Sequence, residues 1–295
     1  MKHLKIATLA LLSMLLGSCE KDVLETSGNE ELLVTSESSL SQKNSTVTTL
    51  AALKSAVSSA VAGDVITISG TIKLDGTLTL SKNGTSSSKI TFQGGVIDCS
   101  GVPGTGRGVA LTGSYWIVRD MTIKNAPDNG LILQNGGFNT VSNVKTLTNK
   151  DTGLQIANGS HDNLITGCYS ANNNDTANGG ENADGFACKQ TGGKNNKFEG
   201  CTAESNSDDG WDLYEQPYTV IINKCIAKTN GKGANGDGNG FKLGSAGQKI
   251  PHTVTNCTAT NNKKNGYDGN GNTGKITITG SGGSGNGQSL FSRIF

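Results

Sequence analysis

The stretch CTAESNSDDGWDL, residues 201–213, contains the pattern that decides the fold. A cysteine stands five residues before Asn206, and Gly210 follows that asparagine by four residues, at the start of another short strand-like segment. Asparagines in the same setting recur at spacings of 24, 24, 33, 24 and 32 residues. They are Asn125, Asn149, Asn173, Asn206, Asn230 and Asn262. The chain is therefore built from repeats of about 24 residues, two of which carry insertions.

Each repeat contains two or three short segments of alternating character and no helical stretch. A repeat of this length and kind indicates one turn of a parallel β-helix, rather than a propeller blade or a leucine-rich repeat. Equivalent residues of stacked turns lie one strand spacing apart, about 4.8 Å, so we expect the aligned asparagines to hydrogen-bond to one another as a ladder. The predicted fold class is all-β, with a short N-terminal capping helix where Leu50, Leu53 and Val57 follow helical spacing.

The first nineteen residues indicate export. A basic start precedes an apolar run of eleven residues from Ile6 to Leu16, too short to span a bilayer, which needs about 20 residues. The segment ends in LGSC, which resembles a bacterial lipoprotein box and predicts a lipid on Cys19 that anchors the protein to the outer membrane. An ordinary secretory signal is the alternative. Residues 20–46 are polar and without periodicity, which predicts a flexible tether, and residues 47–295 remain for the β-helix domain.

The composition restricts the classes of molecule that the protein is expected to bind. The 25 basic and 24 acidic residues give a formal charge of +1, and only three of the basic residues are arginine. This balance argues against a nucleic-acid partner, because phosphate binding needs a basic patch with arginines or aromatics interleaved. Hydrophobic residues make up 34% of the chain and aromatic residues 5%, which favours a narrow core. We expect a monomer that contacts a membrane only through its N-terminal lipid.

Four cysteines share one position in successive turns: Cys168, Cys201, Cys225 and Cys257. This placement favours a column of small apolar thiols buried in the core. Disulfides are the alternative, because an exported protein with an even number of remaining cysteines normally forms them. Pairs with the CxxC spacing of zinc sites are missing from the sequence, which argues against zinc.

Aligning the turns on their glycines brings acidic residues from different turns together. Asp184 and Asp209 each precede such a glycine and are expected to stack on adjacent turns, with Asp208 beside them. Asp212 and Lys242 each stand two positions after the glycine, where alternation points the side chain away from the core. Carboxylates so close together raise one another's pKa values unless a cation neutralises them. A set of oxygen ligands without histidine favours calcium over zinc or copper.

The same residues have simpler interpretations. Asp-Asp-Gly is a common turn signal, and a lysine on a strand is usually a solvated charge. Lys242 is a candidate base, because a neighbouring divalent cation would lower its pKa and make a neutral amine available. Lys189, Tyr214 and Tyr218 are candidates for substrate binding on chain proximity alone.

Three further side chains have predicted locations but no predicted role in chemistry. Alternation along the strand that contains Asp212 turns its neighbour Trp211 inward, so we expect Trp211 in the core rather than stacked on a ligand. His161 and His252 have no serine or cysteine nucleophile near them in the register, and we expect both at the surface.

Three segments carry a family resemblance: NADGFACK (182–189), NSDDGWDLY (206–214) and GNGFKLG (238–244). They resemble the signature segments of polysaccharide lyase family 9, the calcium-dependent pectate lyases with a right-handed parallel β-helix. KITFQGGVIDCSG, residues 89–101, is similar to the early coils of that family. The resemblance implies that Asp184, Asp208, Asp209 and Asp212 hold calcium and that Lys242 is the Brønsted base. It implies β-elimination on pectate or polygalacturonate, an acidic plant polysaccharide, with other uronate polymers left open.

Two rival functions fit the same fold. A pectin-type glycoside hydrolase would use paired aspartates as acid and base, but the Gly-His-Gly and Arg-x-Lys segments of such enzymes are missing from the sequence. A non-catalytic carbohydrate-binding β-helix would use calcium only to stabilise its fold.

Overall fold

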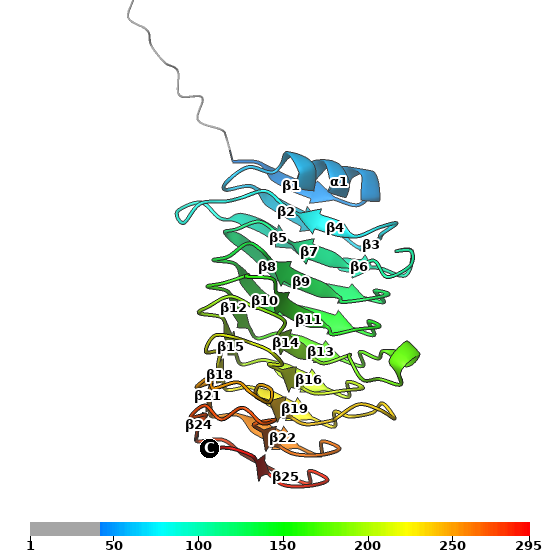
Figure 1. The fold of residues 1–295 in the computed structure, drawn as a ribbon. Helices are drawn as coiled ribbons and strands as arrows, with labels where there is room; N and C mark the ends of the chain where they lie inside the picture. The colour runs from blue at the N-terminus through cyan, green and yellow to red at the C-terminus, as the bar shows by residue number, and fades with distance from the viewer. Residues whose placement is uncertain (1–41) are drawn as a thin grey trace, which may run out of the picture. The chain divides into compact units, whose positions relative to one another are not determined.

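The computed structural model describes residues 42–295 (Figure 1). The predicted lipoprotein signal over residues 1–19, with Cys19, and most of the predicted tether lie outside the described residues. No helix in the described part of the chain is long and apolar enough to cross a membrane.

The described chain begins with strand β1 (Asn44–Val47), which pairs in parallel with β2 (Val65–Ile68). Residues 44–46, the last three of the predicted tether, thus belong to a paired strand. Helix α1 (Leu50–Ser59) follows, within the segment where a capping helix was predicted. Its N-cap Thr49 accepts a hydrogen bond from the backbone N–H of Ala52 at 3.3 Å.

All other regular structure, apart from the short 3₁₀ helix η1 (Thr176–Asn178), is parallel sheet arranged in stacked turns (Figure 1). The nine-stranded sheet contains β4 (Leu78–Leu80), β7 (Val109–Leu111), β9 (Leu131–Gln134), β11 (Leu154–Ala157), β14 (Phe186–Cys188), β17 (Trp211–Asp212), β20 (Phe241–Lys242), β23 (Tyr267–Asp268) and β26 (Phe291–Ser292). The 17-stranded sheet contains β1, β2, β3 (Thr71–Lys73), β5 (Ile90–Gln93), β6 (Val96–Asp98), β8 (Trp116–Lys124), β10 (Thr140–Leu147), β12 (Leu164–Thr166), β13 (Tyr169–Ala171), β15 (Lys197–Glu199), β16 (Thr202–Glu204), β18 (Ile221–Asn223), β19 (Ile226–Lys228), β21 (Thr253–Thr255), β22 (Thr258–Thr260), β24 (Thr277–Thr279) and β25 (Gly282–Ser284). The predicted parallel β-helix is confirmed.

The asparagine ladder is present, with one correction of register. The Nδ2 of Asn149 donates to the Oδ1 of Asn173 at 2.9 Å, and the same bond continues from turn to turn. The further members are Asn206, Asn230, Asn262 and Asn286. Asn125 is not a member. Its place belongs to Ala126, whose N–H donates to the Oδ1 of Asn149 at 3.0 Å.

A second asparagine column, which sequence reasoning missed, runs ten residues ahead of the first. The backbone N–H of Asn139 donates to the Oδ1 of Asn163 at 3.2 Å, and the Nδ2 of Asn163 donates to the Oδ1 of Asn196 at 2.9 Å. His252 occupies the same column and accepts the N–H of Val220 at its Nδ1, at 3.2 Å. His252 is fully buried, so the expectation that it lies at the surface was wrong.

The narrow core contains two inward columns of like side chains among its aliphatic residues. Aromatic rings of consecutive turns stack, with ring centroids 4.8 Å apart between Phe186 and Trp211 and again between Trp211 and Phe241. Trp211 is fully buried, as predicted. The second column is the predicted row of thiols, and all six cysteines of the described chain are free and buried. The sulfur of Cys225 accepts the N–H of Cys201 at 3.4 Å, which fixes the spacing of that column.

The glycines that mark the turns are required by this stacking. A Cβ at Gly210 would lie 2.5 Å from the carbonyl oxygen of Gly240 and 2.9 Å from the Cβ of Ala227 on the next turn. A side chain at this position would therefore push two turns apart.

Candidate active site

Strand register places the outward side chains of the nine-stranded sheet. Asp212 on β17 pairs with Lys242 on β20, and Lys242 pairs with Asp268 on β23. The inward neighbours Trp211 and Phe241 are fully buried, which fixes the orientation of both strands. The predicted one-turn separation of Asp212 and Lys242 on the outer face is confirmed.

Three of the four predicted acidic residues form a buried cluster. Asp184, Asp208 and Asp209 each offer a carboxylate oxygen, and these three oxygens lie within 4.8 Å of one another. Hydrogen bonds fix the cluster, because the Oδ1 of Asp209 accepts the N–H of Asn239 at 2.6 Å and the Oδ1 of Asp208 accepts the N–H of Asp237 at 2.6 Å. The Oδ2 of Asp209 is buried and has no hydrogen-bond partner among the described residues.

The cluster is electrostatically unfavourable without a cation. Burial raises the pKa of all three carboxyl groups, and the charge of Asp209 further raises the pKa of Asp208. The Oδ2 of Asp209 makes no hydrogen bond within residues 42–295 and lies 3.4 Å from the Nζ of Lys242, so a bound cation would remove a remaining desolvation cost. Closely spaced carboxylate oxygens are the donors that calcium prefers, so the residues present fit this ion.

Asp212 lies at the edge of this cluster and is not one of the three mutually close carboxylates. Its Oδ2 is 3.1 Å from the Nζ of Lys189, and its Oδ1 accepts the N–H of Tyr214 at 2.9 Å. Asp212 thus connects the acidic cluster with the lysines beside it.

Lys189, which sequence reasoning named from chain proximity, lies inside the site. Its Nζ donates to the Oδ2 of Asp184 at 2.7 Å and to Asp212, and only 8% of the residue is exposed. Burial lowers the pKa of Lys189, but the two carboxylates outweigh burial and raise it above its ordinary value. Lys189 is therefore a fixed positive charge that offsets part of the acidic cluster.

Lys242 extends from β20 into an open cleft of about 330 Å³, which Lys189 and Tyr214 also line. Its Nζ lies 3.4 Å from the Oδ2 of Asp209 and 3.9 Å from the Oδ1 of Asp212. Burial lowers the pKa of Lys242, but the surrounding carboxylates, Asp209 first, raise it by more. The amine thus borders both the acidic cluster and the space where a ligand would lie.

Asp237 also lines the cleft, although it was not among the predicted site residues. It belongs to the glycine-rich segment Asn235–Gly240 (NGDGNG), and its Oδ2 lies 3.3 Å from the Nζ of Lys242. Its other oxygen contacts the Nζ of Lys264 at 2.5 Å. The density of glycine and aspartate in this segment indicated an inserted loop but assigned no partner to Asp237.

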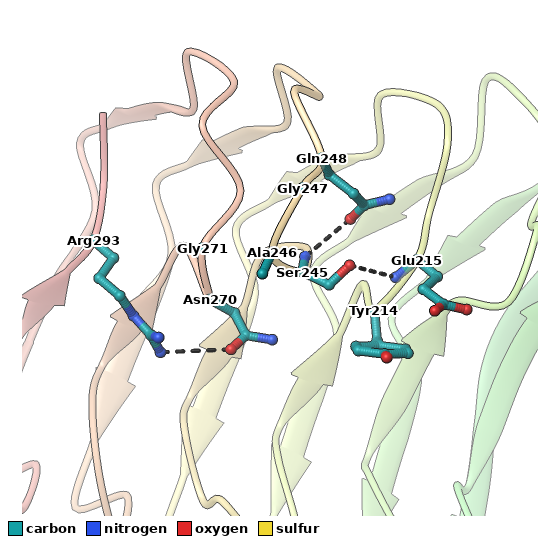
Figure 2. A pocket seen from close by; sticks show the side chains of 9 residues that line it. All are labelled: Tyr214, Glu215, Ser245, Ala246, Gly247, Gln248, Asn270, Gly271 and Arg293. Carbon is teal, nitrogen blue, oxygen red and sulfur yellow. Dashed lines mark hydrogen bonds between the residues drawn. The ribbon is translucent and has the colours of Figure 1, made fainter.

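The two candidate tyrosines, Tyr214 and Tyr218, line different cavities. The ring of Tyr214 lies 5.9 Å from the Nζ of Lys242 and lines the cleft. Tyr218 lines another cavity, with His161 and Lys194. Tyr214 also borders an adjoining cleft of about 490 Å³, whose lining side chains Figure 2 shows.

Comparison with known proteins places this architecture in a family. A family model described as "Pel9A-like, right handed beta helix region" matches residues 32–294. The chain belongs to this family. The resemblance to polysaccharide lyase family 9 and the right-handed parallel β-helix are therefore confirmed.

Relatives of this family carry pectate lyase names. The chain is 43% identical over 205 residues to "Pectate lyase L" of Paenibacillus polymyxa, which covers 63% of this chain and 45% of that protein. It is 30% identical over 275 residues to "Pectate lyase PEL9" of Emericella nidulans, covering 78% of this chain and 67% of that protein. The crystal structure of pectate lyase Pel9A superposes with a TM-score of 0.72 at 32% identity, over 76% of this chain and 61% of that chain. The chain thus spans less than half the length of the Paenibacillus polymyxa protein.

Proposed function

We propose that this protein cleaves pectate or polygalacturonate by calcium-assisted β-elimination, with Lys242 as the base. The observation that carries the proposal is the position of the Lys242 amine, in the wall of an open cleft and 3.4 Å from the buried Oδ2 of Asp209. The pectate lyase names of the relatives and of Pel9A support the substrate class.

Asp184, Asp208 and Asp209 would hold the calcium ion, with Asp212 at the edge of the same cluster. Bound calcium would supply positive charge that favours a neutral Lys242 and draws electrons from the uronate carboxylate, so that the adjacent C5 proton becomes more acidic. Lys189 keeps its positive charge between Asp184 and Asp212 and so holds these two carboxylates apart in fixed positions.

The proton step uses the neutral amine of Lys242. The amine takes the proton from C5, and the electron pair of the broken C–H bond forms a double bond between C5 and C4 as the bond between C4 and the glycosidic oxygen breaks. The departing oxygen takes a proton from water, and the resulting hydroxide takes the proton from the ammonium of Lys242. One product ends in an unsaturated uronate, and the other carries a new hydroxyl group.

Product analysis tests this proposal. The full chain is incubated with polygalacturonate in calcium and in chelator, and the products are followed by ultraviolet absorbance and mass spectrometry. Elimination predicts absorbing, unsaturated ends in calcium and none in chelator. Saturated ends that form in chelator would instead indicate a hydrolase. Binding of the polymer with no cleavage in calcium would indicate a non-catalytic carbohydrate-binding protein.

We also propose that the protein is exported and anchored by a lipid on Cys19. The proposal rests on the apolar segment and the LGSC sequence at the start of the chain. Metabolic labelling with a radioactive fatty acid should label the wild type and not Cys19→Ala. Equal labelling of the two proteins would rule out Cys19 as the attachment site.

A further inference from the structure

A second cleft lies beside the proposed active site and reaches toward the C-terminal turns. Its volume is about 490 Å³. Tyr214 lines both this cleft and the cleft that contains Lys242. Figure 2 shows Tyr214 and Glu215 at one end of this cleft and Arg293 at the other, with Asn270 between them. A ligand that extends past Lys242 along the stacked turns would therefore reach Arg293.

Arg293 is held in place by a buried carboxylate. Its Nε donates to the Oδ1 of Asp268 at 2.8 Å, and its Nη2 donates to the Oδ2 at 2.6 Å. Asp268 is only 2% exposed, and it also accepts the N–H of Asn270 at 2.8 Å and the Nδ2 of Asn265 at 3.0 Å. The arginine side chain is thus oriented by a fully bonded partner rather than left free in solvent.

One edge of the guanidinium group remains available. Within residues 42–295 the Nη1 of Arg293 has no hydrogen-bond partner, and 52% of the side chain is exposed. The planar fork of arginine matches a carboxylate in two hydrogen bonds, which makes it the preferred partner of such groups.

The spacing of the turns relates Arg293 to the reacting position. Lys242 pairs with Asp268 on the next turn, and Asp268 pairs with Ser292, the neighbour of Arg293, on the turn after that. Two turns correspond to about 10 Å along the solenoid. A sugar ring and one turn are similar in length, so a uronate chain lying along the turns would bring another carboxylate near Arg293.

The geometry points to Arg293 as a second anionic subsite, which binds the carboxylate of a uronate unit about two turns from Lys242. This inference rests on the proposed function for its substrate class. It assigns Asp268 the role of a positioning residue, which orients the guanidinium without touching the substrate. It also predicts a preference for free over methyl-esterified uronate at that unit, because an ester offers no negative charge to the arginine.

Binding of hexagalacturonate measures this subsite without requiring cleavage. Calorimetry is carried out in calcium on Lys242→Ala protein, with and without Arg293→Gln. We expect Arg293→Gln to raise Kd about tenfold, which corresponds to about 1.4 kcal/mol. Arg293→Lys should restore part of this loss, since it keeps the charge but not the fork. Arg119→Gln is the matched control, because Arg119 has a similarly exposed side chain but lies on β8 of the other sheet.

A loss of folding must be separated from a loss of binding. Arg293→Gln leaves the buried carboxylate of Asp268 without its cation, so the double variant Asp268→Asn, Arg293→Gln is measured as well. Both proteins should keep the thermal transition of an ordered fold and show the weaker binding. With methyl-esterified hexagalacturonate, the protein that retains Arg293 and the Arg293→Gln variant should give the same Kd.

The outcomes separate this inference from the proposed function. Wild-type cleavage of polygalacturonate together with an unchanged Kd in Arg293→Gln would overturn the subsite and leave the lyase proposal intact. Arg293-dependent binding with no cleavage by the wild type would overturn the lyase proposal and support the subsite. Equal effects of Arg293→Gln on free and esterified oligomers would also contradict a carboxylate contact.

Discussion

Replacing Asp209 with asparagine should stabilise the protein in chelator and remove its response to calcium. Burial raises the pKa of Asp209 to about 8, although Lys242 lowers it in part. A carboxyl group whose pKa is raised in the folded state destabilises the fold at any pH above its unfolded value of 3.8. At pH 7 the difference of about 3 pH units corresponds to at most about 4 kcal/mol. Because the neighbouring carboxylates share this cost, we expect Asp209→Asn to gain about 2 kcal/mol.

Thermal unfolding of the full chain at pH 7 measures this effect. In chelator, Asp209→Asn should unfold about 5 °C above the wild type. Calcium at about 100 times its Kd should stabilise the wild type by about 2.7 kcal/mol and the variant much less. Asp75→Asn is the control, since the side chain of Asp75 is 64% exposed and lies near the helical cap. A cation site would be refuted if calcium left the unfolding temperature of the wild type unchanged and Asp209→Asn unfolded below the wild type in chelator.

Two other predictions concern the stacked columns. The burial of His252 lowers its pKa to about 4, so between pH 6.5 and 4 the unfolded chain binds a proton that the folded chain does not. The free energy of unfolding should therefore fall by about 3 kcal/mol over this pH range. In His252→Gln, denaturation at a series of pH values should show a smaller fall, and an unchanged pH dependence would contradict the assignment. Asn206→Ala should cost about 3 kcal/mol of unfolding free energy, because it leaves buried ladder groups unpaired. Asn125→Gly, outside the ladder, should cost under about 1 kcal/mol, and equal losses would show that the ladder does not matter.

The sequence was sufficient to predict the register of six strands of the nine-stranded sheet, β9, β11, β14, β17, β20 and β23. The glycine before each short strand is required by the close approach of the next turn, so aligning on glycine aligned Asp212 with Lys242 correctly. Aligning the turns on their asparagines gave the wrong register at one turn, that of Asn125. Asn125 has φ +62°, a conformation that asparagine adopts readily, and it stands one position before the ladder for that reason.

The burial of His252 was within reach of sequence reasoning. The second column repeats the spacing of the first, ten residues earlier, and His252 precedes Asn262 by that offset. The contacts of Lys189 and Asp237 were not predictable in the same way. Lys189 follows the end of β14 and turns back toward Asp184, while Asp237 lies on an inserted loop whose path no repeat defines.

The central claim is that stacked turns bring a lysine base to a calcium-binding carboxylate cluster. The most direct test compares Lys242→Ala with wild type in calcium, following unsaturated product from polygalacturonate and thermal stabilisation by calcium in the same preparations. We predict that Lys242→Ala loses at least about a hundredfold in rate, as for a removed general base, and retains calcium stabilisation. Lys197→Ala, on β15 of the other sheet, should match the wild type in both measurements. Unsaturated product formed by Lys242→Ala at the wild-type rate would contradict the claim.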